Sequence, residues 1–141
     1  MDSSPPSPSP LPPPEALRPE DERLYATLIH LSSLLWFFSL PGVLGALILW
    51  LLKRERSEFV DRHGKQAMNF QLTIFLVMAA VSLFAVLSVV LSFLGGFLFF
   101  LPLWGGVIAL FVVQLVLGIQ AAIVASRGEY YQYALCFQFF R

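Results

Sequence analysis

The sequence predicts an all-α membrane protein, a polytopic helix bundle of about four transmembrane helices, the first two short and separated at Pro41-Gly42. Of its 141 residues, 57% are apolar and only 13% are charged, against roughly 25% charged in soluble domains. Two stretches carry no formal charge: 29 residues from Leu24 to Leu52 and 61 residues from Gln66 to Ser126. A bilayer crossing needs about 20 apolar residues. Too little polar surface therefore remains for a soluble monomer.

The N-terminal residues 1–22 are predicted to form a disordered, Pro/Ser-rich cytoplasmic tail. Eight of the first 19 residues are proline, and proline removes the backbone donor that a helix or sheet requires. The predicted transmembrane domain spans residues 23–127, and a short cytoplasmic tail covers residues 128–141. Its helices are expected at about residues 23–40, 43–54, 58–93 and 103–126.

The first uncharged stretch, residues 24–52, allows one crossing, two crossings or a re-entrant hairpin. As one helix it would reach about 43 Å, more than the roughly 30 Å hydrocarbon core. An even number of crossings, or a hairpin, places all nine Lys and Arg residues on one side, whereas one crossing divides them seven to two. Since the positive-inside rule favours the unequal distribution, we expect both termini in the cytoplasm.

The start of the third predicted helix is an amphipathic interfacial segment. Its polar face repeats at the helical spacing of i, i+4, i+7 and i+11, while His63 belongs to a second face with Phe59. Such a segment can lie along the headgroups before entering the bilayer. The polar face consists of Arg62, Gln66, Asn69 and Thr73.

Four polar side chains are candidates for intramembrane function: His30, Asn69, Gln71 and Gln114. An ionisable or polar residue at membrane depth can line a pathway or relay a proton. It can equally hydrogen-bond a neighbouring helix. For His30, the sequence suggests Asn69 as a partner if both lie at similar depth.

The last predicted helix carries a stripe of small residues below Gln114. Small side chains let helix backbones approach closely in lipid. The stripe predicts either the internal seam of the bundle or a homo-oligomer interface. Its members are Gly118, Ala121, Ala122 and Ala125.

Four strings resemble the bacterial Tic-twenty-like family of small integral membrane proteins, which are similar to the import-channel subunit of the chloroplast inner envelope. They are the segments 26–32, 49–54, 59–71 and 128–133. The resemblance covers about residues 23–140 and implies a multi-pass protein of the bacterial inner membrane, with about four helices and no established activity. The family usually has a proline after the last tyrosine, where this chain has Ala134. We therefore expect the helical conformation to continue past Tyr133.

No catalytic motif accompanies these features. The two histidines lie in different segments, and the single cysteine, Cys136, excludes an intramolecular disulfide and a multi-cysteine zinc site. Nine basic and nine acidic residues balance, which argues against nucleic-acid binding. We expect a non-enzymatic bundle without cofactor or metal, whose partners are the lipid bilayer and either further copies or other membrane proteins. The alternatives are a protein-translocation or small-solute permeation component and, less favoured, an enzyme acting on lipid.

Overall fold

The computed structural model describes residues 15–38, 42–92, 100–134 and 136–141, and every regular element in those ranges is helical. The prediction of an all-α fold is therefore confirmed. The elements are α1 (Pro19–Leu31), the 3₁₀-helix η1 (Ser32–Phe38), α2 (Gly42–Lys53), α3 (Glu58–Ser92) and α4 (Phe100–Ser126). Most of the predicted tail, residues 1–14, the break at Pro41 and the turn at Gly95-Gly96 lie outside the described residues.

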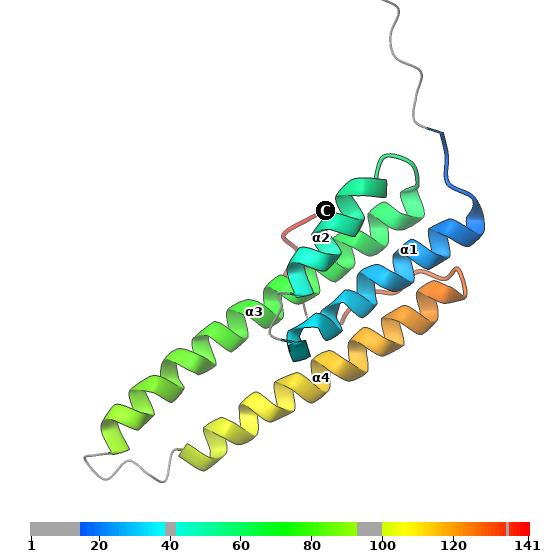
Figure 1. Ribbon diagram of the computed structural model, residues 1–141. Helices are drawn as coiled ribbons and strands as arrows, with labels where there is room; N and C mark the ends of the chain where they lie inside the picture. Colours follow the sequence, from blue (N-terminus) through cyan, green and yellow to red (C-terminus); the bar gives the residue numbers. More distant parts are fainter. Residues whose placement is uncertain (1–14, 39–41, 93–99, 135) are drawn as a thin grey trace, which may run out of the picture.

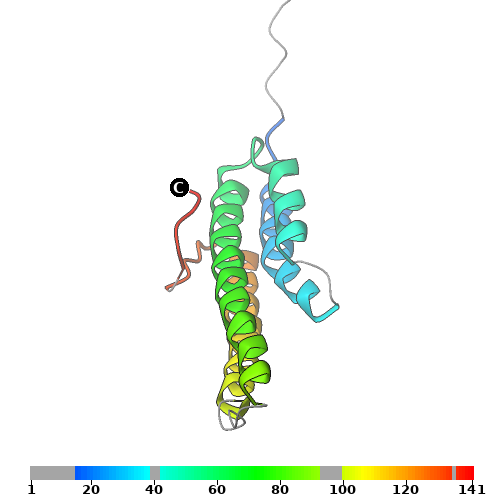
Figure 2. The same ribbon diagram turned by 90° about the vertical axis from the view of Figure 1, so that its left-hand side faces the viewer.

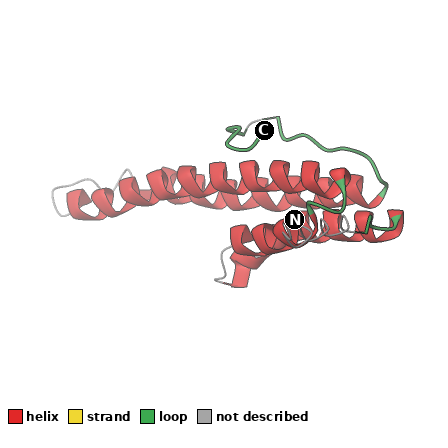
Figure 3. Cartoon of the chain, turned by 90° about the horizontal axis from the view of Figure 1, so that it is seen from above, coloured by secondary structure: helices red, strands yellow, loops and turns green. Residues whose placement is uncertain are grey.

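The two long helices α3 and α4 form an antiparallel pair, and α1 and α2 pack beside one half of it (Figure 1). Seen from above, the short helices form a second layer along part of the pair (Figure 3). The C-terminal segment, residues 127–141, returns over α3 on the side away from α1 (Figure 2). The buried core lies in the half of the pair that α1 and α2 cover.

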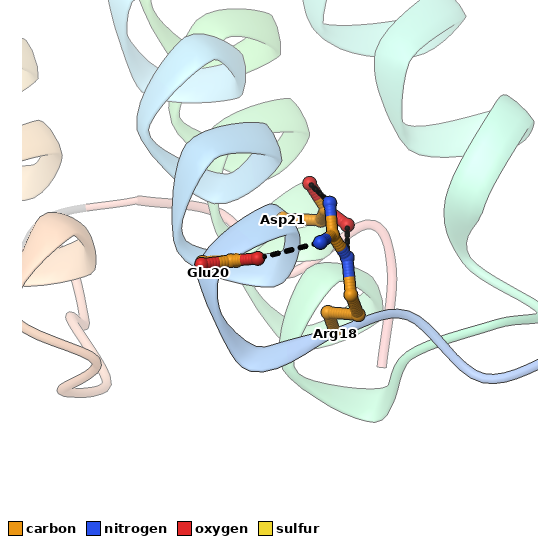
Figure 4. A network of polar contacts seen from close by, with 3 residues as sticks. All are labelled: Arg18, Glu20 and Asp21. Carbon is orange, nitrogen blue, oxygen red and sulfur yellow. Dashed lines mark hydrogen bonds and ion pairs between the residues drawn. The ribbon is translucent and has the colours of Figure 1, made fainter.

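Helix α1 begins a turn earlier than predicted. Pro19 occupies its first turn, where the missing N–H costs no hydrogen bond. The acidic residues Glu20, Asp21 and Glu22 follow and suit the positive end of the helix dipole. Arg18 pairs with Glu20 at 2.8 Å and with Asp21 at 2.9 Å (Figure 4).

The first predicted helix, residues 23–40, changes geometry part-way because α1 gives way to η1 at Ser32. The Ser32 hydroxyl donates to the carbonyl of Ile29 at 2.6 Å, and the Ser33 hydroxyl donates to the carbonyl of His30 at 2.8 Å. Such side-chain bonds compete with the helical ladder. The tighter 3₁₀ geometry follows where the two serines engage these carbonyls.

The long helices are well capped. Ser57 precedes α3, and its hydroxyl accepts the N–H of Val60 at 3.1 Å, which is an N-cap bond. Helix α4 ends in a Schellman motif: the N–H of Gly128 donates to Ala125 and the N–H of Glu129 donates to Val124. Gly128 has φ of 81°, a left-handed conformation that glycine adopts without a steric penalty.

The prediction of four transmembrane helices is not supported by the described residues. Two helices are long and apolar enough to cross a bilayer, in the ranges Glu58–Val90 and Pro102–Ser126. Helix α2 has 12 residues and spans only about 18 Å, and α1 has 13 residues with a charged first turn. The positive-inside argument favoured an even number of crossings but said nothing about the length of each helix.

The exposed surfaces of α3 and α4 explain why these two helices need lipid. In the most apolar 18-residue stretch of α3, only 11% is buried, and in that of α4 only 22% is buried. The core helix of a soluble protein would be mostly buried. Side chains such as Leu83 and Ile108 instead remain more than 60% exposed. An apolar solvent must therefore cover them.

The C-terminal segment does not continue as a helix past Tyr133. Residues 129–134 and 136–141 form no regular secondary structure. The expectation rested on Ala134, which stands where the Tic-twenty-like family has a proline that would stop a helix. The Schellman motif already ends α4 at Ser126. No helix therefore reaches Ala134, and a proline at that position is not needed to stop one.

Candidate functional site

A chain of hydrogen bonds between buried side chains joins α1, α3 and the C-terminal segment. The hydroxyl of Tyr133 lies 3.0 Å from His30 Nδ1, His30 Nε2 lies 2.8 Å from His63 Nδ1, and His63 Nε2 lies 3.1 Å from the carbonyl of Glu129. A carbonyl only accepts, so His63 Nε2 carries the proton. It follows that His30 Nε2 donates to His63 and that Tyr133 donates to His30 Nδ1. We call these three side chains the His–Tyr network.

Burial keeps the His–Tyr network uncharged. His30 is fully buried and His63 is 1% exposed. Desolvation, and secondarily the neighbouring His63, lowers the pKa of His30 to about 3. Burial raises the pKa of Tyr133 well above its usual range. Both groups are therefore neutral at neutral pH, as the assigned hydrogen-bond directions require.

Aromatic packing surrounds this network. The ring of Tyr133 stacks on Phe70 at 4.0 Å between centroids, and Tyr131 meets Tyr133 edge-on at 4.9 Å. Tyr130 stacks on His63 at 5.9 Å. The tyrosines of the C-terminal segment thus close over the polar groups. The sequence had suggested Asn69 as the partner of His30, and this is wrong because Tyr133 and His63 take both ring nitrogens.

Asn69 instead holds the end of the chain. Its Oδ1 accepts the N–H groups of Phe139 and Phe140 at 2.9 and 2.8 Å, and its Nδ2 donates to the carbonyl of Phe140 at 2.9 Å. One turn on, the Thr73 hydroxyl accepts the N–H of Phe137 at 2.9 Å. Asn69 and Thr73 form a clamp that gives a non-helical segment its missing backbone partners.

Replacing Asn69 with Leu should release residues 137–141 while leaving the helices folded. The amides of Phe139 and Phe140 lose their acceptor, at a cost of about 1–3 kcal/mol for two bonds. Their hydrogen exchange should accelerate roughly 10- to 100-fold, measured by mass spectrometry in detergent. Ser88→Ala is the control, because the Ser88 hydroxyl donates within α3, to the carbonyl of Phe84. Unchanged exchange at these amides in Asn69→Leu would contradict the clamp.

Two glutamines fix the bend between α1 and η1. Gln114 Nε2 in α4 donates to the carbonyl of Ser33 at 3.1 Å, and Gln71 Nε2 in α3 donates to the hydroxyl of Ser32 at 3.3 Å. Both side chains are buried. The four intramembrane polar candidates therefore lie inside the bundle and bond to the chain itself, but they form separate contacts rather than one site.

The small-residue stripe of α4 lies against α1. A Cβ on Gly118 would meet Ser33 Oγ at 2.6 Å, and Ala121, Ala122 and Ala125 are all buried. Thr27 of α1 also reaches the carbonyl of Ala122 at 3.5 Å. Of the two interpretations that the sequence left open, the structure places the stripe at the internal seam.

The interfacial segment divides between surface and interior. Arg62 is exposed and pairs with Glu58 at 2.8 Å, whereas Asn69, Thr73 and His63 are buried. Gln66 is partly exposed, and its buried Oε1 has no hydrogen-bond partner in the described chain. The predicted polar face thus exists, but its inner part holds the C-terminal segment rather than the headgroups.

Trp50 is the contact residue that the sequence analysis missed. Its indole N–H donates to Asp61 Oδ1 at 2.8 Å, and its ring meets Phe140 at 5.3 Å between centroids. The ring also lies against the backbone at Gly64. The contact between Trp50 and Gly64 could not be inferred from the sequence, because the point where two helices cross depends on the tertiary packing.

Among the described residues, no group of three or more His, Cys, Asp or Glu side chains is placed to bind a metal ion. The histidine nitrogens are taken up by the His–Tyr network. The chemistry of this site is hydrogen bonding between buried neutral groups, which fixes one arrangement of helices and C-terminal segment.

Fold and site together define a small helical membrane protein with two long apolar helices, a short helical hairpin and a clamped C-terminal segment. The chain belongs to the MamF/MmsF family, described as the magnetosome magnetite crystal formation protein family, whose model matches residues 21–140. Searches of the curated proteins and of the solved structures find no match.

The family match corrects the resemblance to Tic-twenty-like proteins. The strings that suggested it contain His30, His63, Asn69 and Tyr133, the residues that join the helices to the C-terminal segment. In this chain these residues hold the bundle and the C-terminal segment together. The expectation that this chain is a helical membrane protein is confirmed.

Proposed function

We propose that this chain is a non-enzymatic integral protein of the magnetosome membrane that contributes to magnetite crystal formation. The observation that carries the proposal is the match of the MamF/MmsF family model to residues 21–140. The two apolar helices support residence in a membrane. The paired, neutral groups of the His–Tyr network support a structural rather than a catalytic role.

The proposed placement has α3 and α4 crossing the bilayer and the α1–η1–α2 hairpin lying within one half of it. The beginnings of α1 and α3 and the ends of α2 and α4 lie at one end of the bundle (Figure 1). The charged residues belong to these ends, since residues 66–126 carry no formal charge. By the positive-inside rule this end faces the cytoplasm, in the magnetosome membrane as in a bacterial inner membrane.

The same placement constrains how the protein can act on a crystal. The opposite end of the α3–α4 pair would face the lumen, and the sequence there has no Asp, Glu, Lys or Arg. Carboxylates are the oxygen ligands that hard cations prefer, and this end supplies none. We propose that the protein acts through the membrane and its partners rather than by binding iron at charged side chains.

The test is expression in a magnetosome-forming bacterium that lacks its own family members. Crystal dimensions are measured by electron microscopy, and the protein is located in isolated magnetosome membranes. We expect the chain to shift the crystal size distribution, and Gly105→Ala, which changes an exposed position of α4, to act like the wild type. A chain present in magnetosome membranes without any effect on crystals would overturn the proposal.

A further inference from the structure

A hollow of about 480 Å³ lies between the first turns of α3 and the C-terminal segment. Arg62, Lys65 and Gln66 line it from α3, and Tyr130, Gln132 and Arg141 line it from the segment. The segment leaves α4 at Gly128 and turns back to reach Asn69, so the open hollow lies between α3 and two parts of the segment, residues 130–132 and 138–141. The clamp at Asn69 keeps these two parts in place.

The lining of this hollow is cationic. Three basic side chains, Arg62, Lys65 and Arg141, face it, and no acidic side chain of the described residues belongs to its lining. Arg62 lies 4.9 Å from the centre of the Tyr130 ring, which fixes its guanidinium beside the hollow. Three basic side chains therefore meet at one level of the bundle.

Two of these cations already have acidic partners. Arg62 lies 2.8 Å from Glu58, and Lys65 lies 2.6 Å from Asp61. Glu58 is 74% exposed, so its pairing is weak. A guanidinium has five donor hydrogens and an ammonium has three. Each can therefore keep its carboxylate and bind a second acceptor, and the oxygens of a phosphate suit both.

The hollow lies at the level where phospholipid headgroups would be. Arg62 and Lys65 are the last charged residues before the uncharged run that begins at Gln66. Farther along α3, a second hollow of about 350 Å³ is lined by Thr73, Ala134, Cys136 and Phe137. A lipid with its phosphate in the cationic hollow would have this more apolar recess on its acyl-chain side.

We infer that the cationic hollow binds a phosphate group, supplied by the headgroup of an anionic phospholipid such as phosphatidylglycerol. This inference rests on the two-span placement proposed above. The Gln66 side chain also belongs to the lining, and its amide N–H can donate to a phosphate oxygen. The bound lipid would join α3 to the C-terminal segment from the membrane side.

The test uses the full chain in nanodiscs and in detergent, with lipid retention measured by native mass spectrometry. Phosphatidylglycerol and phosphatidylcholine of identical acyl chains are compared, and inorganic phosphate is added as a competitor. The wild type should retain phosphatidylglycerol in preference. Arg62→Gln/Lys65→Gln should reduce this retention at least about fivefold, which is roughly 1 kcal/mol.

The matched control is Arg56→Gln/Arg127→Gln, which removes two charges from the same end of the bundle outside the hollow's lining. It should retain the lipid like the wild type. Arg141→Gln removes the third basic side chain of the lining. Because Arg141 lies outside the helices, this change leaves the helices intact. Displacement of the lipid by millimolar phosphate would support a site that also accepts free phosphate.

Equal retention of both lipids without phosphate binding would overturn the inference, as would an equal loss in the control. A chain that does not insert into nanodiscs would instead refute the two-span placement. A chain that inserts but shows no phosphatidylglycerol preference would leave the proposed function standing and remove only this site.

Discussion

Replacing His30 with Phe is expected to lower the free energy of unfolding by about 2–5 kcal/mol. Phe keeps a ring in the fully buried position but removes the acceptor of Tyr133 and the donor to His63. Each buried polar group left without a partner costs about 1–3 kcal/mol. The measurement is the unfolding midpoint in detergent, compared with Leu24→Phe at an exposed position of the same helix, expected within about 0.5 kcal/mol of wild type.

The pH dependence separates the loss of the His–Tyr network from simple misfit. The pKa of His30 is about 3 in the folded protein and about 6.5 when unfolded. Below pH 6.5 the unfolded chain therefore binds a proton that the folded chain does not. The contribution of His30 to stability is complete above pH 6.5 and falls as the pH decreases, by up to about 1.4 kcal/mol per unit.

This slope should be smaller in His30→Phe, where His63 is the remaining histidine of the network. The other titratable groups beside position 30 are Tyr131 and Tyr133, which stay protonated in this range. A variant with wild-type stability at neutral pH and an unchanged slope below it would show that the network does not hold the bundle together.

Gly64→Ala is expected to destabilise the protein by more than about 2 kcal/mol, although Ala is the better helix former. In an open helix the change would stabilise by about 0.5–1 kcal/mol. At position 64, however, a Cβ would collide with the Trp50 side chain, whose own Cβ lies only 2.9 Å away. Trp50 would have to move, and its bond to Asp61 and its contact with Phe140 would be lost.

The matched controls for Gly64→Ala lie in α4, where a Cβ on Gly105 or Gly106 meets nothing within 4 Å. These substitutions should raise the unfolding midpoint slightly. Trp50 fluorescence in variants lacking the other tryptophans reports the local change directly. If Gly64→Ala stabilised the protein as much as Gly105→Ala does, α2 would not pack on α3 as described.

The sequence predicted the helical class and the membrane correctly because both follow from local composition. A run of 61 uncharged residues satisfies its backbone in lipid only as helices. The same local information led to four spans, since short apolar segments such as residues 43–54 resemble short crossings. It also placed the small-residue stripe and the polar candidates on the right helices, without deciding what they contact.

Only the tertiary structure brought His30 to Tyr133 and Asn69 to Phe140, which lie 103 and 71 residues apart in the chain. The burial of Tyr133 depends on the end of α4 at Gly128, which redirects the chain over α3. Periodicity describes which face of a helix is polar, whereas the partner of that face depends on how separate segments pack.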